Sequence, residues 1–140
     1  MQLKIKKLNP DATLPSYAHP GDAGMDLFSV EAVMIKPNER ISVKTGIALD
    51  LDPGFAALCW DKSGLSRKHG LKTLGGVIDA GYRGEVSISL INLSSEEYYI
   101  EKGHKIANMI IQRVEQCVIE EVEELSDTSR GEGAFGSTGK

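Results

Sequence analysis

The sequence has 140 residues, of which 41% are hydrophobic and 26% charged, and its formal net charge at pH 7 is −4. A chain of this length forms one domain with a substantial core and leaves little room for a second. The acidic balance excludes a general polyanion binder, so we expect no nucleic-acid partner. Cys59 and Cys117 form neither a disulfide framework nor a metal-ligand pattern, and we predict two buried free thiols.

The amino terminus, Met1 to Lys7, alternates apolar and polar residues and lacks the apolar core of a signal peptide. No stretch of the chain has the apolar length of a transmembrane helix. We therefore expect a soluble cytoplasmic protein with no membrane partner.

Alternating apolar and polar residues predict short β-strands along most of the chain. After a strand-like start, strands are expected over residues 41–47, 86–90, 106–114 and 118–122, although 106–114 could also be a helix. One short helix is predicted around Ser63 to His69, with Gly70 as its C-cap. Short strands separated by Gly- and Pro-containing turns are typical of an all-β sandwich or jelly roll.

We expect a β domain over residues 1–125 and a flexible C-terminal arm over 126–140. The end of the arm combines glycines, hydroxyl groups, an arginine and an aromatic ring, which suit a nucleoside triphosphate. A Walker A loop is excluded because Ser137 stands where that motif requires lysine. Taken alone, the arm is equally typical of a disordered tail.

Two internal segments suit metal and anion binding. Asp26, close after a glycine, could contact a metal through water, although a lone aspartate in this context is more often part of an Asx-turn. Lys62, Ser63 and Gly64 lead into the predicted helix and offer a cation, a hydroxyl and backbone N–H groups to an anion. Ser-Gly pairs are also common turns, so each segment alone is weak evidence.

The segment from Gly75 to Gly84 predicts a hairpin of two short strands joined by a glycine turn. Its backbone could pair with the donors and acceptors of a pyrimidine, and Asp79 is a candidate general base for a water molecule. Tyr82 could lie flat on a sugar and leave no space for an extra hydroxyl. A decorated β-turn explains the glycines but not Asp79 and Tyr82 together.

A fourth segment, around Lys105, is a basic turn that enters a strand and is by itself typical of a charged surface. The three histidines are far apart in sequence, and none has a Cys or His partner at metal-ligand spacing. We therefore expect separate histidines and no His-based metal site.

In this order and at these spacings, the four internal segments and the arm resemble the five motifs of the trimeric deoxyuridine triphosphatase (dUTPase) family. The most specific parts are Gly76-Val77-Ile78-Asp79-x-x-Tyr82-Arg83-Gly84 and Arg130-Gly-x-Gly-x-Phe135-Gly-Ser-Thr-Gly. The resemblance implies a jelly-roll-like subunit in a homotrimer. It also implies active sites between subunits, each completed by a C-terminal arm from another chain.

The resemblance further implies hydrolysis of dUTP to dUMP and pyrophosphate with Mg²⁺ as cofactor, which keeps uracil out of DNA and supplies dUMP for thymidylate synthesis. Asp79 would activate the water that attacks the α-phosphorus, Asp26 would contact the hydrated Mg²⁺, and Tyr82 would pack against deoxyribose. The other implied substrate-binding positions, including Phe135 as the ring over uracil, are Lys62, Ser63, Gly64, Gly76, Ile78, Lys105, Arg130, Phe135, Gly136, Ser137 and Thr138.

Some positions depart from the family pattern. Lys62 stands where arginine is usual, and lysine keeps the charge without the planar fork of a guanidinium. His104 replaces an acidic or amide residue, and Asn108 replaces a glutamine with a shorter amide.

Two other functions compete with this interpretation. The dCTP deaminases have a similar fold and share the Ile-Asp-x-Gly segment of the predicted hairpin. They carry a catalytic glutamate in the next strand, where this chain has Ser89. A catalytically silent nucleotide-binding scaffold would keep the glycine-rich segments and lose the base, and the presence of Asp79 disfavours it. The sequence therefore favours a dUTPase.

Overall fold

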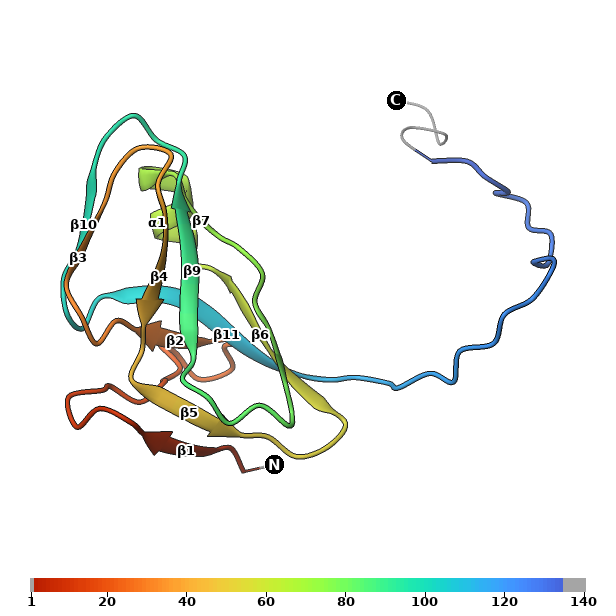
Figure 1. Cartoon of the computed structure of the whole chain (residues 1–140), viewed down its shortest axis with the longest axis horizontal. Helices are drawn as coiled ribbons and strands as arrows, with labels where there is room; N and C mark the ends of the chain where they lie inside the picture. Colours follow the sequence, from red (N-terminus) through yellow and green to blue (C-terminus); the bar gives the residue numbers. More distant parts are fainter. Residues whose placement is uncertain (1, 135–140) are drawn as a thin grey trace.

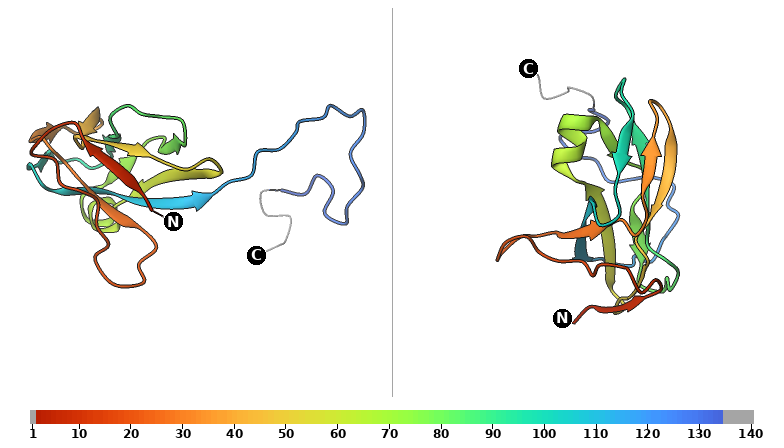
Figure 2. Two further views of the ribbon diagram at one scale, coloured as in Figure 1. Left: turned by 90° about the horizontal axis from the view of Figure 1, so that it is seen from below. Right: turned by 90° about the vertical axis from the view of Figure 1, so that its left-hand side faces the viewer.

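The computed structural model describes residues 2–134, which form a β-rich body and a long C-terminal segment that runs away from it (Figures 1 and 2). The strands are β1 (Lys4–Lys7), β2 (Met25–Phe28), β3 (Val33–Ile35), β4 (Arg40–Lys44), β5 (Ile47–Asp50), β6 (Phe55–Asp61), β7 (Leu71–Thr73), β8 (Val77–Asp79), β9 (Ser87–Asn92), β10 (Tyr98–Ile100) and β11 (Lys105–Arg113). The helix α1 spans Ser63–His69. Across residues 2–134, no helix is both long and apolar enough to cross a membrane.

Antiparallel pairing organises the described strands into sheets with the orders β2-β11-β6-β8, β4-β9-β7, β1-β5 and β10-β3. Their inner faces share one core, whose largest fully buried side chains include Leu27, Ile35, Leu90, Ile106 and Met109. Burial of these apolar side chains supplies the main driving force for folding. The predicted all-β, jelly-roll-like class is confirmed.

Several local predictions are confirmed. The helix ends at His69, and Gly70 caps it in the left-handed conformation with φ of 66°. Residues 106–114, for which a helix was the alternative, fall almost entirely within β11. The strand predicted over 41–47 is instead divided into β4 and β5, because the backbone turns at Gly46 with φ of 72°.

The hairpin predicted from Gly75 to Gly84 is not formed. β8 pairs with β6, whereas β9 pairs with β4 and β7, so the two consecutive strands lie in different sheets. Residues 80–86, called the β8–β9 loop below, connect the sheets. The sequence pattern identifies two strands and a turn, but it does not specify which strands pair.

The prediction of a strand over residues 118–122 is also wrong. β11 ends at Arg113, and the following segment pairs with no strand among residues 2–134 (Figure 1). Val118 and Ile119 are 98% and 94% exposed, and Cys117 is exposed although it was predicted to be buried. An alternating segment becomes a strand only with a partner. The domain boundary near residue 126 stays a prediction.

Asp61 fixes the end of β6, directly before the helix. Its Oδ1 accepts hydrogen bonds from the Thr73 N–H at 2.7 Å and from the Thr73 hydroxyl at 2.6 Å, and Lys72 Nζ lies 2.9 Å from its Oδ2. Burial raises the pKa of Asp61, but these donors outweigh it and hold the pKa below its usual value. The carboxylate thereby joins β6 to β7 and fixes the point from which residues 62–64 continue.

Replacing Asp61→Asn should lower the free energy of unfolding at pH 7 by about 1–3 kcal/mol, because hydrogen bonds to a charged acceptor are stronger than neutral ones. The folded pKa lies below the unfolded value of about 3.9, so this stabilisation is present above that value and is lost as the pH falls through the folded pKa. Urea unfolding at one fixed protein concentration should show a difference that shrinks below about pH 4. Asp52→Asn, at an exposed position, is the control. Equal loss in both variants would contradict the assignment.

Candidate active site

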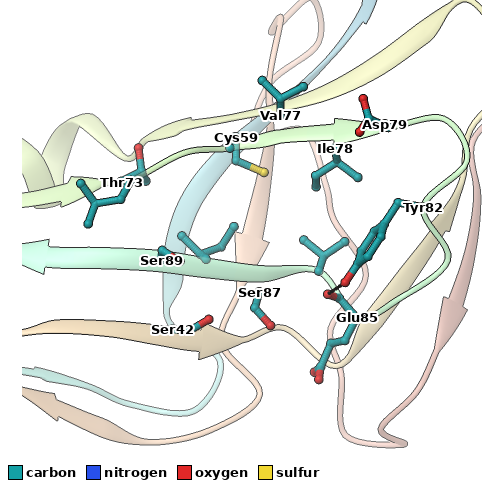
Figure 3. Close-up of a pocket in the computed structure, with 14 residues that line it drawn as sticks. Ser42, Cys59, Thr73, Val77, Ile78, Asp79, Tyr82, Glu85, Ser87 and Ser89 are labelled. Carbon is teal, nitrogen blue, oxygen red and sulfur yellow. Dashed lines mark hydrogen bonds between the residues drawn. The ribbon is translucent and has the colours of Figure 1, made fainter.

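A pocket of about 350 Å³ lies between β8 and the face of β9 (Figure 3). Four residues singled out from the sequence, Gly76, Ile78, Asp79 and Tyr82, line it. The pocket exists because β8 and β9 belong to different sheets and leave a space between them. We call it the β8–β9 pocket.

The wall formed by β8 has an unpaired backbone edge. β8 is the terminal strand of its sheet and pairs only with β6 among the described strands. At its start, the Gly76 carbonyl accepts a hydrogen bond from the Cys59 N–H at 2.7 Å. Gly76 has φ of 118°, and a Cβ there would lie 2.5 Å from the Cys59 carbonyl oxygen, so a side chain is excluded at this position.

The β8–β9 loop fixes Tyr82 beside Asp79. The Tyr82 N–H donates to the Asp79 carbonyl at 3.1 Å, and the Tyr82 hydroxyl donates to the Glu85 carbonyl at 3.1 Å. Side chains alternate along β8, so Ile78 points toward β9 while Asp79 lies on the other side, at the rim, with its residue exposed (Figure 3). Tyr82 therefore lines the pocket, and Asp79 lies at its rim with the carboxylate on the side of β8 away from β9.

Some polar residues of the pocket escaped the sequence analysis. Ser87 and Ser89 line it from β9, and the alternation of residues 86–90 could have placed both on one face. Glu85 also lines the pocket, and its carboxylate accepts the Gly46 N–H at 2.9 Å. Burial raises the pKa of the Cys59 thiol, another lining group, to about 11, so this thiol is neutral at physiological pH.

A second group of the predicted residues gathers around Asp26, a β2 residue that is only 1% exposed. Lys62 Nζ lies 2.5 Å from Asp26 Oδ1, and Lys105 Nζ lies 2.8 Å from Oδ2. Burial raises the pKa of Asp26, but the two ammonium groups outweigh it and hold the pKa below its usual value. This Asp26 cluster thus has two cations for one anion, which leaves positive charge for an anionic ligand.

Asn108 and the start of α1 complete the surroundings of the Asp26 cluster. Asn108 Nδ2 donates to Asp26 Oδ1 at 3.4 Å, and a Cβ at Gly24 would lie 1.6 Å from Asn108 Oδ1. The short amide therefore occupies the space that Gly24 leaves open and faces the carboxylate. Ser63 and Gly64 follow Lys62 in the first turn of α1, where both are exposed.

The oxygen ligands available at Asp26 suit a hydrated Mg²⁺ that is held mainly by phosphates. Mg²⁺ keeps several waters and typically uses one or two carboxylates together with substrate phosphates. Asp26 Oδ2 is buried, and its partner is Lys105 Nζ at 2.8 Å, an ammonium group that can turn toward another anion. Among residues 2–134, no group of three or more His, Cys, Asp or Glu residues could hold a metal alone. The residues fit a metal that arrives with a ligand.

Asp79 and the Asp26 cluster lie far apart in one chain. Asp79 pairs with Ala56 near the start of β6, whereas Lys62 follows the end of β6, six positions after Ala56. At about 3.3 Å per strand residue, this corresponds to roughly 20 Å. One chain therefore does not bring Asp79 and Lys62 together.

Of the residues predicted in the arm, Arg130 lies within the described part of the chain. Its Nε donates to the Gly133 carbonyl at 2.9 Å, within a local turn that starts at Thr128. It lines neither the β8–β9 pocket nor the Asp26 cluster. The remaining arm positions lie outside the described residues: Phe135, Gly136, Ser137 and Thr138.

Comparison with known proteins places this geometry in a family. The family model of dUTPase matches residues 10–139. The chain is 53% identical to the deoxyuridine 5'-triphosphate nucleotidohydrolase of Clostridium kluyveri over 99% of both proteins. It is 51% identical to that of Clostridioides difficile, over 98% of this chain and 97% of the relative.

Solved structures agree with the sequence comparison. The dUTPase of Staphylococcus bacteriophage 80alpha with dUPNHPP matches with a TM-score of 0.94 and 32% identity, over 99% of both chains. A variant dUTPase of phage phi11 of S. aureus, which coordinates a structural Mg(II) ion, matches with a TM-score of 0.85 and 28% identity, over 91% of this chain and 100% of the other. The chain therefore belongs to the dUTPase family.

Proposed function

We propose that this protein is a homotrimeric, Mg²⁺-dependent enzyme that hydrolyses dUTP to dUMP and pyrophosphate in the cytoplasm. The observation that carries the proposal is the β8–β9 pocket, which the free edge of β8 and Tyr82 line together and which has Asp79 at its rim. Relatives that share about half of the sequence are named for this activity, and a similar structure holds the dUTP analogue dUPNHPP. The reaction would keep uracil out of DNA and supply dUMP for thymidylate synthesis.

Uracil would bind against the backbone of β8. An unpaired strand edge presents N–H and C=O groups, which can complement the donors and acceptors of a pyrimidine, as they do for an added peptide strand. Tyr82 is held by its hydrogen bond to the Glu85 carbonyl, so its ring is a fixed surface for the sugar. Deoxyribose would pack on this ring, and the 2'-hydroxyl of ribose would collide with it.

Asp79 would act as the general base at the rim of the pocket. Its residue is exposed, so a water molecule can reach the carboxylate and transfer a proton to it. The water oxygen would bond to the α-phosphorus, and the bond from that phosphorus to the bridging oxygen of pyrophosphate would break. Phosphoryl-type transfer needs little covalent chemistry from the protein, so the orientation of Asp79 and neutralisation of charge carry most of the catalysis.

The phosphates would be held by the Asp26 cluster of a neighbouring subunit. Asp79 and Lys62 of one chain are separated by roughly 20 Å along β6, so the base and the phosphate-binding lysine of one site would come from different subunits. A cyclic trimer resolves this by placing the pocket of one subunit against the cluster of the next. Lys62, Ser63, Gly64 and Lys105 would then face the phosphates.

Asp26 would hold a hydrated Mg²⁺ that accompanies the phosphates, and this ion would neutralise charge on the phosphate oxygens. Lys62 and Lys105 cover the two oxygens of Asp26 in the described structure. At least one of these lysines would therefore turn toward a phosphate as the substrate binds. The arm of another chain would close the site, with Arg130, Ser137 and Thr138 on the phosphates, Phe135 over uracil and Gly136 as a further substrate-binding position.

Replacing Asp79→Asn should lower kcat for dUTP by about 100-fold or more, because general base catalysis contributes factors of this size. The amide keeps the shape of the side chain, so KM should change little. Pyrophosphate release from dUTP with Mg²⁺ measures both quantities, and dCTP, dTTP and UTP should be poor substrates. Asp52→Asn, exposed and outside the pocket, is the matched control. An unchanged rate in Asp79→Asn would rule out the proposed base, and binding of dUTP without turnover by the unsubstituted protein would favour the scaffold.

Two inactive variants should restore activity when they share a trimer. One is Asp79→Asn, and the other is a chain that ends at Asp127 and lacks the closing motif. In trimers co-assembled at a 1:1 ratio, about a quarter of the sites would receive both an intact Asp79 and an intact arm from different chains. Pyrophosphate release should therefore reach about a quarter of the unsubstituted rate. If Asp79 and the arm act within one chain, the mixture will stay as inactive as either variant alone.

A further inference from the structure

We propose that Arg83 and Asp50 are positioning residues that orient the β8–β9 loop, and with it Asp79 and Tyr82. The inference deepens the proposed function and rests on it. Arg83 follows Tyr82 in sequence but lies outside the β8–β9 pocket, in a separate groove that Asp50 and Lys4 also line. Arg83 therefore acts on the site through the loop and not on the substrate.

Arg83 binds the loop at two points. Its Nη1 donates to the carbonyl of Ala80 at 2.5 Å and to the carbonyl of Tyr82 at 3.0 Å. Both carbonyls belong to the turn that directly follows Asp79. A planar guanidinium with fixed donor directions restrains such a turn better than a single ammonium group does.

The same guanidinium ties the loop to the body of the subunit. Arg83 Nη2 donates to Asp50 Oδ1 at 2.5 Å, and Asp50 is the last residue of β5. Lys4 Nζ lies 3.6 Å from Asp50 Oδ2, which adds β1 to the connection. Leu49, next to Asp50, is buried in the core, so Asp50 is attached to a rigid part of the molecule.

This connection matters because β8 is a weak support for a catalytic group. β8 has three residues, none of them fully buried, and it pairs on one side only among the described strands. The Tyr82 N–H is bonded to the Asp79 carbonyl, so a rotation of the loop would displace both residues. Rate and sugar selectivity are sensitive to displacements of about 1 Å. An exposed ion pair adds little to global stability, so the effect should fall on the site and not on folding.

Asp50→Asn is the sharpest test. It removes the charge that holds Arg83 and leaves the residues of the β8–β9 loop, including Arg83, unchanged. We expect kcat for dUTP to fall about three- to tenfold. The preference in kcat/KM for dUTP over UTP should fall as well, because Tyr82 loses its fixed position. Asp50→Glu, which can still pair with Arg83, should keep most of the activity, whereas Arg83→Lys should lose at least as much as Asp50→Asn.

The matched control is Asp11→Asn, which breaks the exposed ion pair of Lys102 with Asp11 at 2.7 Å, away from the pocket. It should leave kcat and the dUTP preference unchanged. Hydrogen exchange of peptides that span residues 79–85 gives a readout without substrate, and exchange should be faster in Asp50→Asn than in Asp11→Asn.

The outcomes separate the inference from the proposed function. If the unsubstituted protein fails to hydrolyse dUTP, the proposed function is wrong, and exchange alone then decides whether Asp50 orients the loop. If the unsubstituted protein is active and Asp50→Asn matches Asp11→Asn in kcat and in dUTP preference, the inference is overturned.

Discussion

The rise of an extended strand is the constraint on which the arrangement of the site depends. β6 is a stiff, hydrogen-bonded rod, and it carries the partner of Asp79 near one end and Lys62 beyond the other. No side chain is long enough to close the resulting gap. In the proposed mechanism, the base-binding and phosphate-binding halves of one site would therefore come from different subunits.

Electrostatics prepares the phosphate-binding half before any ligand arrives. Burying a carboxylate such as Asp26 costs free energy unless the charge is paired. Lys62, which follows β6, and Lys105, which begins β11, provide this pairing. The pairing also restrains two flexible lysine side chains close to where phosphates would bind. A lysine at position 62 suits this arrangement, because a compact ammonium can exchange one anionic oxygen for another without matching a planar fork.

The sequence predicted the features that depend on neighbouring residues, such as the helix and the alternation of a strand. The helix with its Gly70 cap and the alternation of β9 follow from propensity and side-chain burial. Gly76, Ile78, Asp79 and Tyr82 do line one pocket. Strand pairing is decided by distant residues, so the sequence suggested a hairpin where β8 and β9 join separate sheets. The contacts around Asp26 join residues 36 and more positions apart, and no local pattern encodes them.

The extended segment after β11 has a consequence for how the protein behaves when diluted. Val118, Ile119 and Leu125 are each at least 87% exposed, and residues 114–134 pair with no described strand. An exposed apolar segment without a pairing partner promotes aggregation. In the proposed trimer, a neighbouring subunit would cover these side chains, so dissociation would expose them and lower the solubility of the subunit. Subunit concentration, and not only the free energy of folding, would then set the working lifetime of this protein.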